Sequence, residues 1–342
     1  MIKFTGLLFL LILLFSSHTI EIIASELADY PPVLNICRGI NMGNMLESPY
    51  REGSWGTILK EEYLQLAKEA GFDHVRVPIR WSDYTDKNPP YEIEESFFQR
   101  IDEVIEQAEA YGLITIINVH HYEEIMTEPA KHKERFLAIW KQIAERYQDH
   151  PDTLYFEILN EPQNKLTASL WNQYLMEAIE IIRETNPDRI LVVGGAYWNN
   201  IDGLRELKLP EDDKNILVTF HYYNPFEFTH QGANWAEGAN AWLGRTWTGS
   251  FREKRMIELE LDRAVKWAQE NKRPLYLGEF GAYERADLES RIRWTNFVAR
   301  EAEKRNIPWA YWEFNSGFGI YDPVKDQWRD ELLQALIPEN TD

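Results

Sequence analysis

Short apolar runs alternate with longer amphipathic segments from residue 36 to the end of the chain. Each run is bounded by turn-forming or polar residues, which is typical of buried parallel strands. The eight runs are Ile36–Ile40, His74–Val77, Leu113–Val119, Leu154–Ile158, Ile190–Val193, Ile216–Phe220, Leu275–Leu277 and Trp309–Trp312. A chain of 342 residues with eight such runs has the length of one large α/β domain.

The segments between the runs carry apolar residues on one face, as helices that cover a sheet do. They are Lys60–Ala70, Phe97–Tyr111, Phe136–Tyr147, Leu170–Glu184, Met256–Asn271, Arg291–Arg305 and Asp330–Leu336, with only a short helix expected within Asn200–Leu209. The first two end at Gly71 and Gly112, which are suitable residues for a helix C-terminus. Eight β/α units predict the α/β class and a single-domain (β/α)8 TIM barrel, which we place at residues 26–342.

An open doubly wound sheet is the alternative to the barrel. Such a sheet would need a glycine-rich phosphate turn after its first strand, and Gly39–Asn44 does not match the G-x-G-x-x-G pattern. The chain also lacks CxxC, HExxH and phosphate-loop motifs, so we expect no metal and no cofactor.

The N-terminal segment combines Lys3 with the apolar stretch Phe4–Phe15 and small residues beyond it, as a secretory signal peptide does. This stretch is short for a helix that spans a bilayer. We therefore expect residues 1–25 to be a signal peptide and the mature protein to be secreted, without stable membrane insertion. An uncleaved anchor is the alternative. Cys37 is the only cysteine, which excludes an intramolecular disulfide, and we expect its side chain to be buried at the first strand.

The composition narrows the class of partner. A net charge of −20 disfavours nucleic acid and anionic membranes, which require basic patches. A neutral polysaccharide is not repelled by that charge. The 13 tryptophans could stack on sugar rings, although tryptophan is also a common core residue.

Residues suited to acid–base or sugar chemistry lie at nearly every predicted strand end. In a (β/α)8 barrel the active site lies at the C-terminal ends of the strands. The residues found there are Arg76, His120, His121, Asn160, Glu161, His221, Tyr223, Glu279 and Trp312. Glu161 and Glu279 follow the fourth and seventh strands, and a glycoside hydrolase needs two carboxyl groups facing each other across a sugar bond.

The motif Asn160-Glu161-Pro162, taken together with Arg76, His221-Tyr222-Tyr223, Gly278–Gly281 and Trp312, resembles glycoside hydrolase family 5. The resemblance covers roughly residues 33–338 and is strongest toward bacterial endo-β-1,4-glucanases, some of which also cleave β-mannans. It implies a retaining (β/α)8 hydrolase in which Glu161 is the general acid/base and Glu279 is the nucleophile.

The same resemblance implies roles for the neighbours of the two glutamates. Arg76 would favour the ionised form of Glu279, and Tyr223 would donate a hydrogen bond to it. His221 would hold Glu161, and Asn160 would bind the sugar 2-hydroxyl. His120 and Trp312 would lie around the scissile bond. The resemblance places Asn44, Glu47 and His121 at distal subsites, and Trp235 would be a stacking platform on the long loop 224–252.

The sequence leaves other roles open for the two glutamates and other functions open for the protein. Glu161 could be a helix N-terminal carboxylate, and Glu279 could form a structural ion pair with Arg76. Glu157, in mid-strand, is interpreted as structural. The function that we expect is a monomeric, secreted endo-β-1,4-glucanase acting on β-glucan, with β-1,4-mannanase or mixed activity as the alternative. Two other classes are a non-catalytic polysaccharide-binding barrel and a metal-dependent hydrolase using histidines such as His120, for which no H-x-H pair is present.

Overall fold

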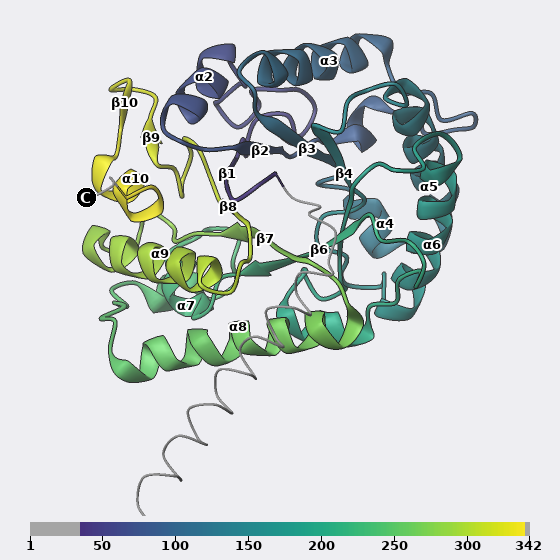
Figure 1. Ribbon diagram of the computed structural model, residues 1–342. Helices are drawn as coiled ribbons and strands as arrows, with labels where there is room; N and C mark the ends of the chain where they lie inside the picture. Colours follow the sequence, from purple (N-terminus) through teal and green to yellow (C-terminus); the bar gives the residue numbers. More distant parts are fainter. Residues whose placement is uncertain (1–34, 339–342) are drawn as a thin grey trace, which may run out of the picture. The chain divides into compact units, whose positions relative to one another are not determined.

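Eight parallel strands close into a barrel in the order β1 to β8 (Figure 1). The computed structural model describes residues 35–338 of the chain. The strands are β1 (Arg38–Asn41), β2 (His74–Val77), β3 (Ile114–Asn118), β4 (Leu154–Glu157), β5 (Leu191–Gly194), β6 (Ile216–Tyr222), β7 (Leu275–Phe280) and β8 (Trp309–Tyr311). The predicted barrel is therefore confirmed. The predicted signal peptide, residues 1–25, lies outside the described residues and stays a prediction, as does the domain boundary at residue 26.

Helices surround the strands as an outer ring (Figure 1). They are α2 (Glu61–Glu69), α3 (Glu95–Ala110), α4 (Glu123–Thr127), α5 (Pro129–Arg146), α6 (Ala168–Thr185), α7 (Phe226–Thr229), α8 (Phe251–Asn271), α9 (Leu288–Glu303) and α10 (Asp330–Leu336), with 3-10 helices η1 (Trp81–Tyr84), η2 (Ile201–Glu206) and η3 (Ala239–Trp242). A small hairpin of β9 (Tyr321–Asp322) and β10 (Gln327–Trp328) follows β8. Every predicted helix is present, and η2 takes the place of a full helix after β5. Within residues 35–338 no helix is long and apolar enough to cross a membrane.

The ends of β6 and β7 differ from the prediction. Both strands continue beyond their apolar runs, to Tyr222 and Phe280, and a register shift after Phe220 brings His221 opposite Glu279. Glu279 is therefore part of β7 and does not follow its end. The hydrophobic pattern stops early because polar side chains of the site occupy the last strand positions, while the backbone pairing continues.

Nearly half of the 13 tryptophans are fully buried in the core. Six have side chains that are essentially inaccessible to solvent: Trp81, Trp140, Trp171, Trp247, Trp294 and Trp309. Two of these connect helices to strand ends by hydrogen bonds. Trp140 Nε1 on α5 donates to the Ile158 carbonyl after β4 at 2.8 Å, and Trp171 Nε1 on α6 donates to the Gly194 carbonyl of β5 at 2.9 Å. Only Trp55, Trp198 and Trp235 are strongly exposed. Tryptophan content alone therefore overstates the number of rings available to a ligand.

The expectation of a buried Cys37 is wrong. The residue precedes β1 and is exposed, and its backbone N–H donates to the Asp73 carboxylate. The predicted strand begins at Ile36, two residues before the observed start of β1 at Arg38, so Cys37 lies outside the barrel strand.

Candidate active site

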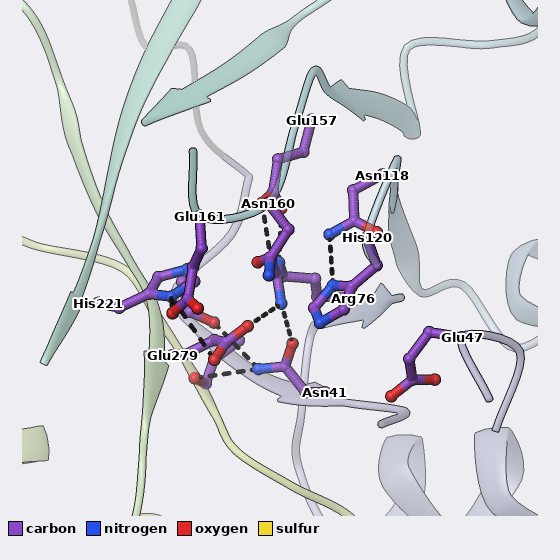
Figure 2. A network of polar contacts seen from close by, with 12 residues as sticks. Asn41, Glu47, Arg76, Asn118, His120, Glu157, Asn160, Glu161, His221 and Glu279 are labelled. Atoms are coloured by element: carbon purple, nitrogen blue, oxygen red, sulfur yellow. Dashed lines mark hydrogen bonds and ion pairs between the residues drawn. The ribbon is translucent and has the colours of Figure 1, made fainter. Parts of the chain in front are cut away.

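Arg76 on β2 lies at the centre of a buried cluster of polar and charged side chains (Figure 2). We call Arg76, Asn41, Glu157, Asn160 and Glu279 the charge cluster. Its side chain is fully buried. Nη1 donates to Glu279 Oε1 and to Asn41 Oδ1, each at 2.7 Å. Nη2 donates to Glu157 Oε1 and to Asn160 Oδ1, also at 2.7 Å, and Nε donates to Glu157 Oε2. All five N–H groups of the guanidinium thus donate hydrogen bonds. Because the guanidinium is planar and rigid, these bonds fix the positions of its four partner side chains relative to one another.

The carboxyl groups of Glu161 and Glu279 meet at this cluster. An oxygen of Glu161 lies within 4.8 Å of an oxygen of Glu279 and of a ring nitrogen of His221. The Glu161 Oε1 to His221 Nδ1 distance is 2.7 Å, and the Glu279 Oε2 to His221 Nδ1 distance is 3.5 Å. The hydroxyl of Tyr223 donates to Glu279 Oε2 at 2.9 Å. Glu279 therefore accepts from two donors, Arg76 and Tyr223, whereas the hydrogen-bond partner of Glu161 among residues 35–338 is the His221 imidazole alone.

Burial governs the protonation of this pair. It raises the pKa of Glu161 to about 8, although 26% of the side-chain surface still faces the cleft. Burial also raises the pKa of Glu279, and the nearby His221 and Arg76 oppose that rise. The expected influence of Arg76 has the right sign, but burial outweighs it. Burial lowers the pKa of His221 to about 4, so the imidazole is neutral at neutral pH.

The two glutamates lie in a long cleft formed by two adjoining cavities of about 740 Å³ each. Glu161, Tyr223, His230 and Trp235 line both cavities. The first cavity continues toward the β1, β3 and β8 ends, with Asn44, Trp55, His120, His121 and Trp312 on its wall. The second continues toward β5 and β6, with Trp198, Asn200, Phe226, Glu260 and Arg263. The acid pair thus lies part-way along a groove that extends to either side.

The cellulase family model, glycosyl hydrolase family 5, matches residues 37–317. The chain belongs to this family. It is 37% identical to endoglucanase H of Acetivibrio thermocellus over 89% of the chain, which is only 33% of that longer protein. It is 30% identical to endoglucanase C of the same organism, of which it covers 98%.

Solved structures of the family superimpose over nearly the whole barrel. Thermotoga maritima Cel5A with cellobiose has a TM-score of 0.86 and 54% identity, over 88% of this chain and 97% of that one. The cellulose synthase subunit Z of Clostridioides difficile has a TM-score of 0.86 and 44% identity, over 89% and 100%. The resemblance seen in the sequence is therefore confirmed, and the protein is a glycoside hydrolase of family 5.

Most of the predicted site residues converge on this family 5 cleft. His120 Nδ1 is bonded to the Asn118 amide nitrogen at 3.0 Å, and its ring stacks on Trp312 with centroids 5.6 Å apart and planes within 6°. Asn44 and His121 line the same wall. Trp235 remains 59% exposed over the groove, which suits a stacking platform.

Two predicted substrate-binding residues are too deeply buried for that role. Glu47 is fully buried, lines neither cavity and accepts hydrogen bonds from the backbone N–H groups of Asn44 and Met45; it lies apart from the charge cluster (Figure 2). Its burial raises its pKa to about 8. It holds the loop that presents Asn44 and does not itself face the cleft. Arg76 is also fully buried and acts through Glu279. The position of Glu47 near Asn44 in sequence gave no indication of which of the two faces inward.

The cleft also contains residues that the sequence did not single out. Trp55 borders the first cavity, with its ring 5.6 Å from that of His121 in an edge-on contact. Trp198 and Phe226 border the second cavity. His230 lines both cavities, and its ring stacks on Phe226 at a centroid distance of 4.0 Å. A usable signal for His230 was present, because it belongs to the same polar and aromatic segment that begins at His221.

The cluster that could hold a metal consists of Glu161, His221 and Glu279. Each offers one ligand atom, but these atoms already contact one another at hydrogen-bond or ion-pair distance. Neither His120 nor His121 belongs to a cluster of this kind within the described part of the chain. The set of histidines required by the metal-dependent alternative is therefore not brought together. Glu157, interpreted as structural, is fully buried against Arg76, as expected.

Proposed function

We propose that the protein is a secreted, retaining endo-β-1,4-glucanase in which Glu161 is the acid/base and Glu279 is the nucleophile. The observation that carries this proposal is the pair of opposed carboxyl groups, with oxygens within 4.8 Å, in a cleft that extends to either side of them. Retaining glycosidases hold their two carboxyl groups about 5–5.5 Å apart, whereas inverting ones leave about 6.5–9.5 Å for a water molecule.

In the first step the Glu279 carboxylate attacks the anomeric carbon of the sugar. The bond from that carbon to the leaving oxygen breaks, and Glu161 transfers its proton to this oxygen. A glycosyl ester of Glu279 results. In the second step Glu161, now ionised, takes a proton from a water molecule that attacks the same carbon, and the ester bond breaks. Two inversions leave the product with the configuration of the substrate.

The surroundings favour this division of roles. A high pKa keeps Glu161 protonated at neutral pH, as an acid must be. Hydrogen bonds from Arg76 and Tyr223 stabilise the negative charge of Glu279 and aim its oxygens. Arg76 also donates to Asn160 Oδ1, which leaves the amide NH2 group to bind the sugar 2-hydroxyl. Trp312 provides the floor on which the ring beside the scissile bond rests.

The shape of the cleft supports an endo-acting enzyme. Exposed rings lie on both sides of Glu161: Trp55 on one side, Trp198 on the other, and Trp235 where the cavities meet. A polymer chain can therefore bind along the groove with an internal linkage at the acid pair. A β-mannan is the second candidate substrate, because Thermotoga maritima Cel5A, 54% identical to this chain, has been solved with mannotriose as well as with cellobiose.

Product release from barley β-glucan, carboxymethylcellulose and glucomannan, measured in parallel, tests the activity. We expect turnover on the glucans and weaker turnover on glucomannan. Glu279→Gln should reduce turnover by several orders of magnitude and leave oligosaccharide affinity in place. Glu237→Gln is the matched control, since Glu237 is an exposed carboxylate on the wall of the second cavity and should have little effect.

Three results would overturn parts of the proposal. Saccharide binding by the wild type without release from any of the three polymers would indicate a binding barrel. An α-anomer as first product, observed by NMR, would exclude the retaining mechanism. Full-length protein held in the membrane fraction of the producing cells would indicate an uncleaved anchor in place of secretion.

A further inference from the structure

The turn Tyr197–Asn199 after β5 has an unusual backbone. Its three successive residues have φ values of 65°, 57° and 52°, in the left-handed region, and none is glycine. Residues with a Cβ adopt this region at an energetic cost, and a run of three is rare. Such strain persists where the surrounding structure enforces it, and it is concentrated at functional sites.

Two backbone hydrogen bonds connect this turn to the acid/base pair. The Trp198 N–H donates to the carbonyl of Pro162, the residue after Glu161, at 3.3 Å. The Asn199 carbonyl accepts from the His221 N–H at 2.8 Å. Glu161 also has positive φ, at 47°. The turn therefore restrains both Glu161 and the imidazole that contacts it.

The Asn199 side chain packs against Gly194, the last residue of β5. It is fully buried, and a Cβ on Gly194 would overlap its amide. Gly194 of β5 pairs with Thr219 of β6. On the other side of β6, a Cβ on Gly278 would lie 2.5 Å from Thr219 Oγ1 and 3.3 Å from His221 Nε2. Gly194 and Gly278, which lack a Cβ, thus leave space for three polar side chains. These side chains belong to Asn199, Thr219 and His221.

These polar groups have no hydrogen-bond partner within residues 35–338. They are both amide atoms of Asn199, the hydroxyl of Thr219 and Nε2 of His221. Buried polar groups without partners are uncommon in native proteins and call for an explanation. Nε2 of a neutral imidazole donates a hydrogen bond if it carries the ring proton and accepts one if it does not. The Asn199 amide and the Thr219 hydroxyl can each donate or accept, so they suit either tautomer. We call Asn199, Thr219 and His221 Nε2 the polar floor of the site.

We propose that Asn199 and Thr219 are positioning residues for proton transfer at Glu161, acting through His221. A water molecule held by the Asn199 amide and the Thr219 hydroxyl donates to Nε2, since these groups make no direct hydrogen bond to it. The ring proton is then on Nδ1, between the two carboxyl groups. His221 then holds Glu161 in the orientation from which it protonates the leaving oxygen. This inference rests on the proposed function, because it assigns a role to residues around the same acid/base.

The dependence of activity on the leaving group tests this role. Asn199→Gly keeps a residue that accepts positive φ and removes the amide, and Thr219→Val removes only the hydroxyl. For cello-oligosaccharides, whose leaving oxygen needs a proton, we expect kcat/KM to fall about tenfold, a fraction of the 10²–10⁴-fold that a general acid supplies. For 2,4-dinitrophenyl β-cellobioside, whose leaving group needs no proton, we expect a change of less than about threefold.

Two control variants separate positioning from loss of packing. Thr115 on β3 is also fully buried, and its hydroxyl has no hydrogen-bond partner in the described part of the chain, so Thr115→Val should leave kcat/KM for both substrates unchanged. Thr219→Ser keeps the hydroxyl and should restore wild-type behaviour. Should Asn199→Gly fail to fold, Thr219→Val with its two controls still decides the matter.

The outcomes also distinguish this inference from the proposed function. A wild type that releases nothing from any β-glucan or from the aryl cellobioside would refute the proposed function. An active wild type whose Thr219→Val variant loses the same factor on both substrates, or no more than Thr115→Val, would refute the positioning role alone. The ¹⁵N chemical shifts of His221 provide a second measurement: the Nδ1-protonated tautomer is expected in the wild type, and an Nε2-protonated ring would contradict the inference.

Discussion

Replacing Arg76 by methionine removes the cation from the centre of the charge cluster at nearly constant volume. Five hydrogen bonds are lost, and the carboxylates of Glu157 and Glu279 lose their only buried cationic partner among the ion pairs described for residues 35–338. Breaking a buried ion pair by removing one partner costs about 3–5 kcal/mol, because the remaining charge is left in a poorly solvating environment. A domain typically has about 5–15 kcal/mol of stability, so the variant should fold but with a large deficit.

This deficit should depend on pH in a defined direction. Burial already raises the pKa of Glu279, and loss of Arg76 raises it further. A carboxyl group whose folded pKa lies above its unfolded value of about 4.3 favours the folded state at low pH, and that contribution is lost as the pH rises through the folded pKa. The Arg76→Met variant should therefore be less destabilised at pH 5 than at pH 8.

Urea unfolding followed by tryptophan fluorescence at the two pH values measures both effects. Arg135→Met is the matched control, because Arg135 is also buried but donates to the carbonyl oxygens of Ser82, Thr85 and Asp86. Its loss should be similar at pH 5 and pH 8. A deficit below about 1 kcal/mol for Arg76→Met, or one that does not change with pH, would refute the argument that uncompensated buried carboxylates dominate its cost.

Two further predictions concern the cleft. Activity should decline as the pH rises through about 8, where Glu161 loses its proton. Glu161→Gln should raise the thermal midpoint more at pH 7.5 than at pH 5. Above about pH 4.3 the unfolded chain loses the proton that the folded protein keeps on Glu161 up to about pH 8, so wild-type stability falls across this range. Equal gains at both pH values would contradict the raised pKa. Trp235→Ala should raise KM for β-glucan on the order of tenfold, or about 1.4 kcal/mol, with kcat little changed. Trp242→Ala, on the same loop but outside both cavities, is its control, and matching effects of the two would exclude a stacking role for Trp235.

The order of strands and helices could be predicted from the sequence because the residues that define each element are close together along the chain. Apolar runs such as His74–Val77 and Leu154–Ile158 match the strands closely, and the helices that end before Gly71 and Gly112 do so with positive φ of 99° and 67° at those glycines. The site could be located because the chain order of a (β/α)8 barrel brings every strand end to one face. Glu161 and Glu279 therefore meet although they are far apart in the sequence.

Only the tertiary structure decided which side chains face the cleft and which are buried beneath it. Asn44 and Glu47 belong to one short loop, yet the first lines the groove and the second is buried. Trp198 and His230 reach the cleft through loops of β5 and β6, whose paths depend on contacts with distant segments. Periodicity reports the neighbours of a residue along the chain, whereas exposure and pKa depend on neighbours from other strands. The barrel could therefore be predicted from the pattern alone, and the protonation of its acid pair could not.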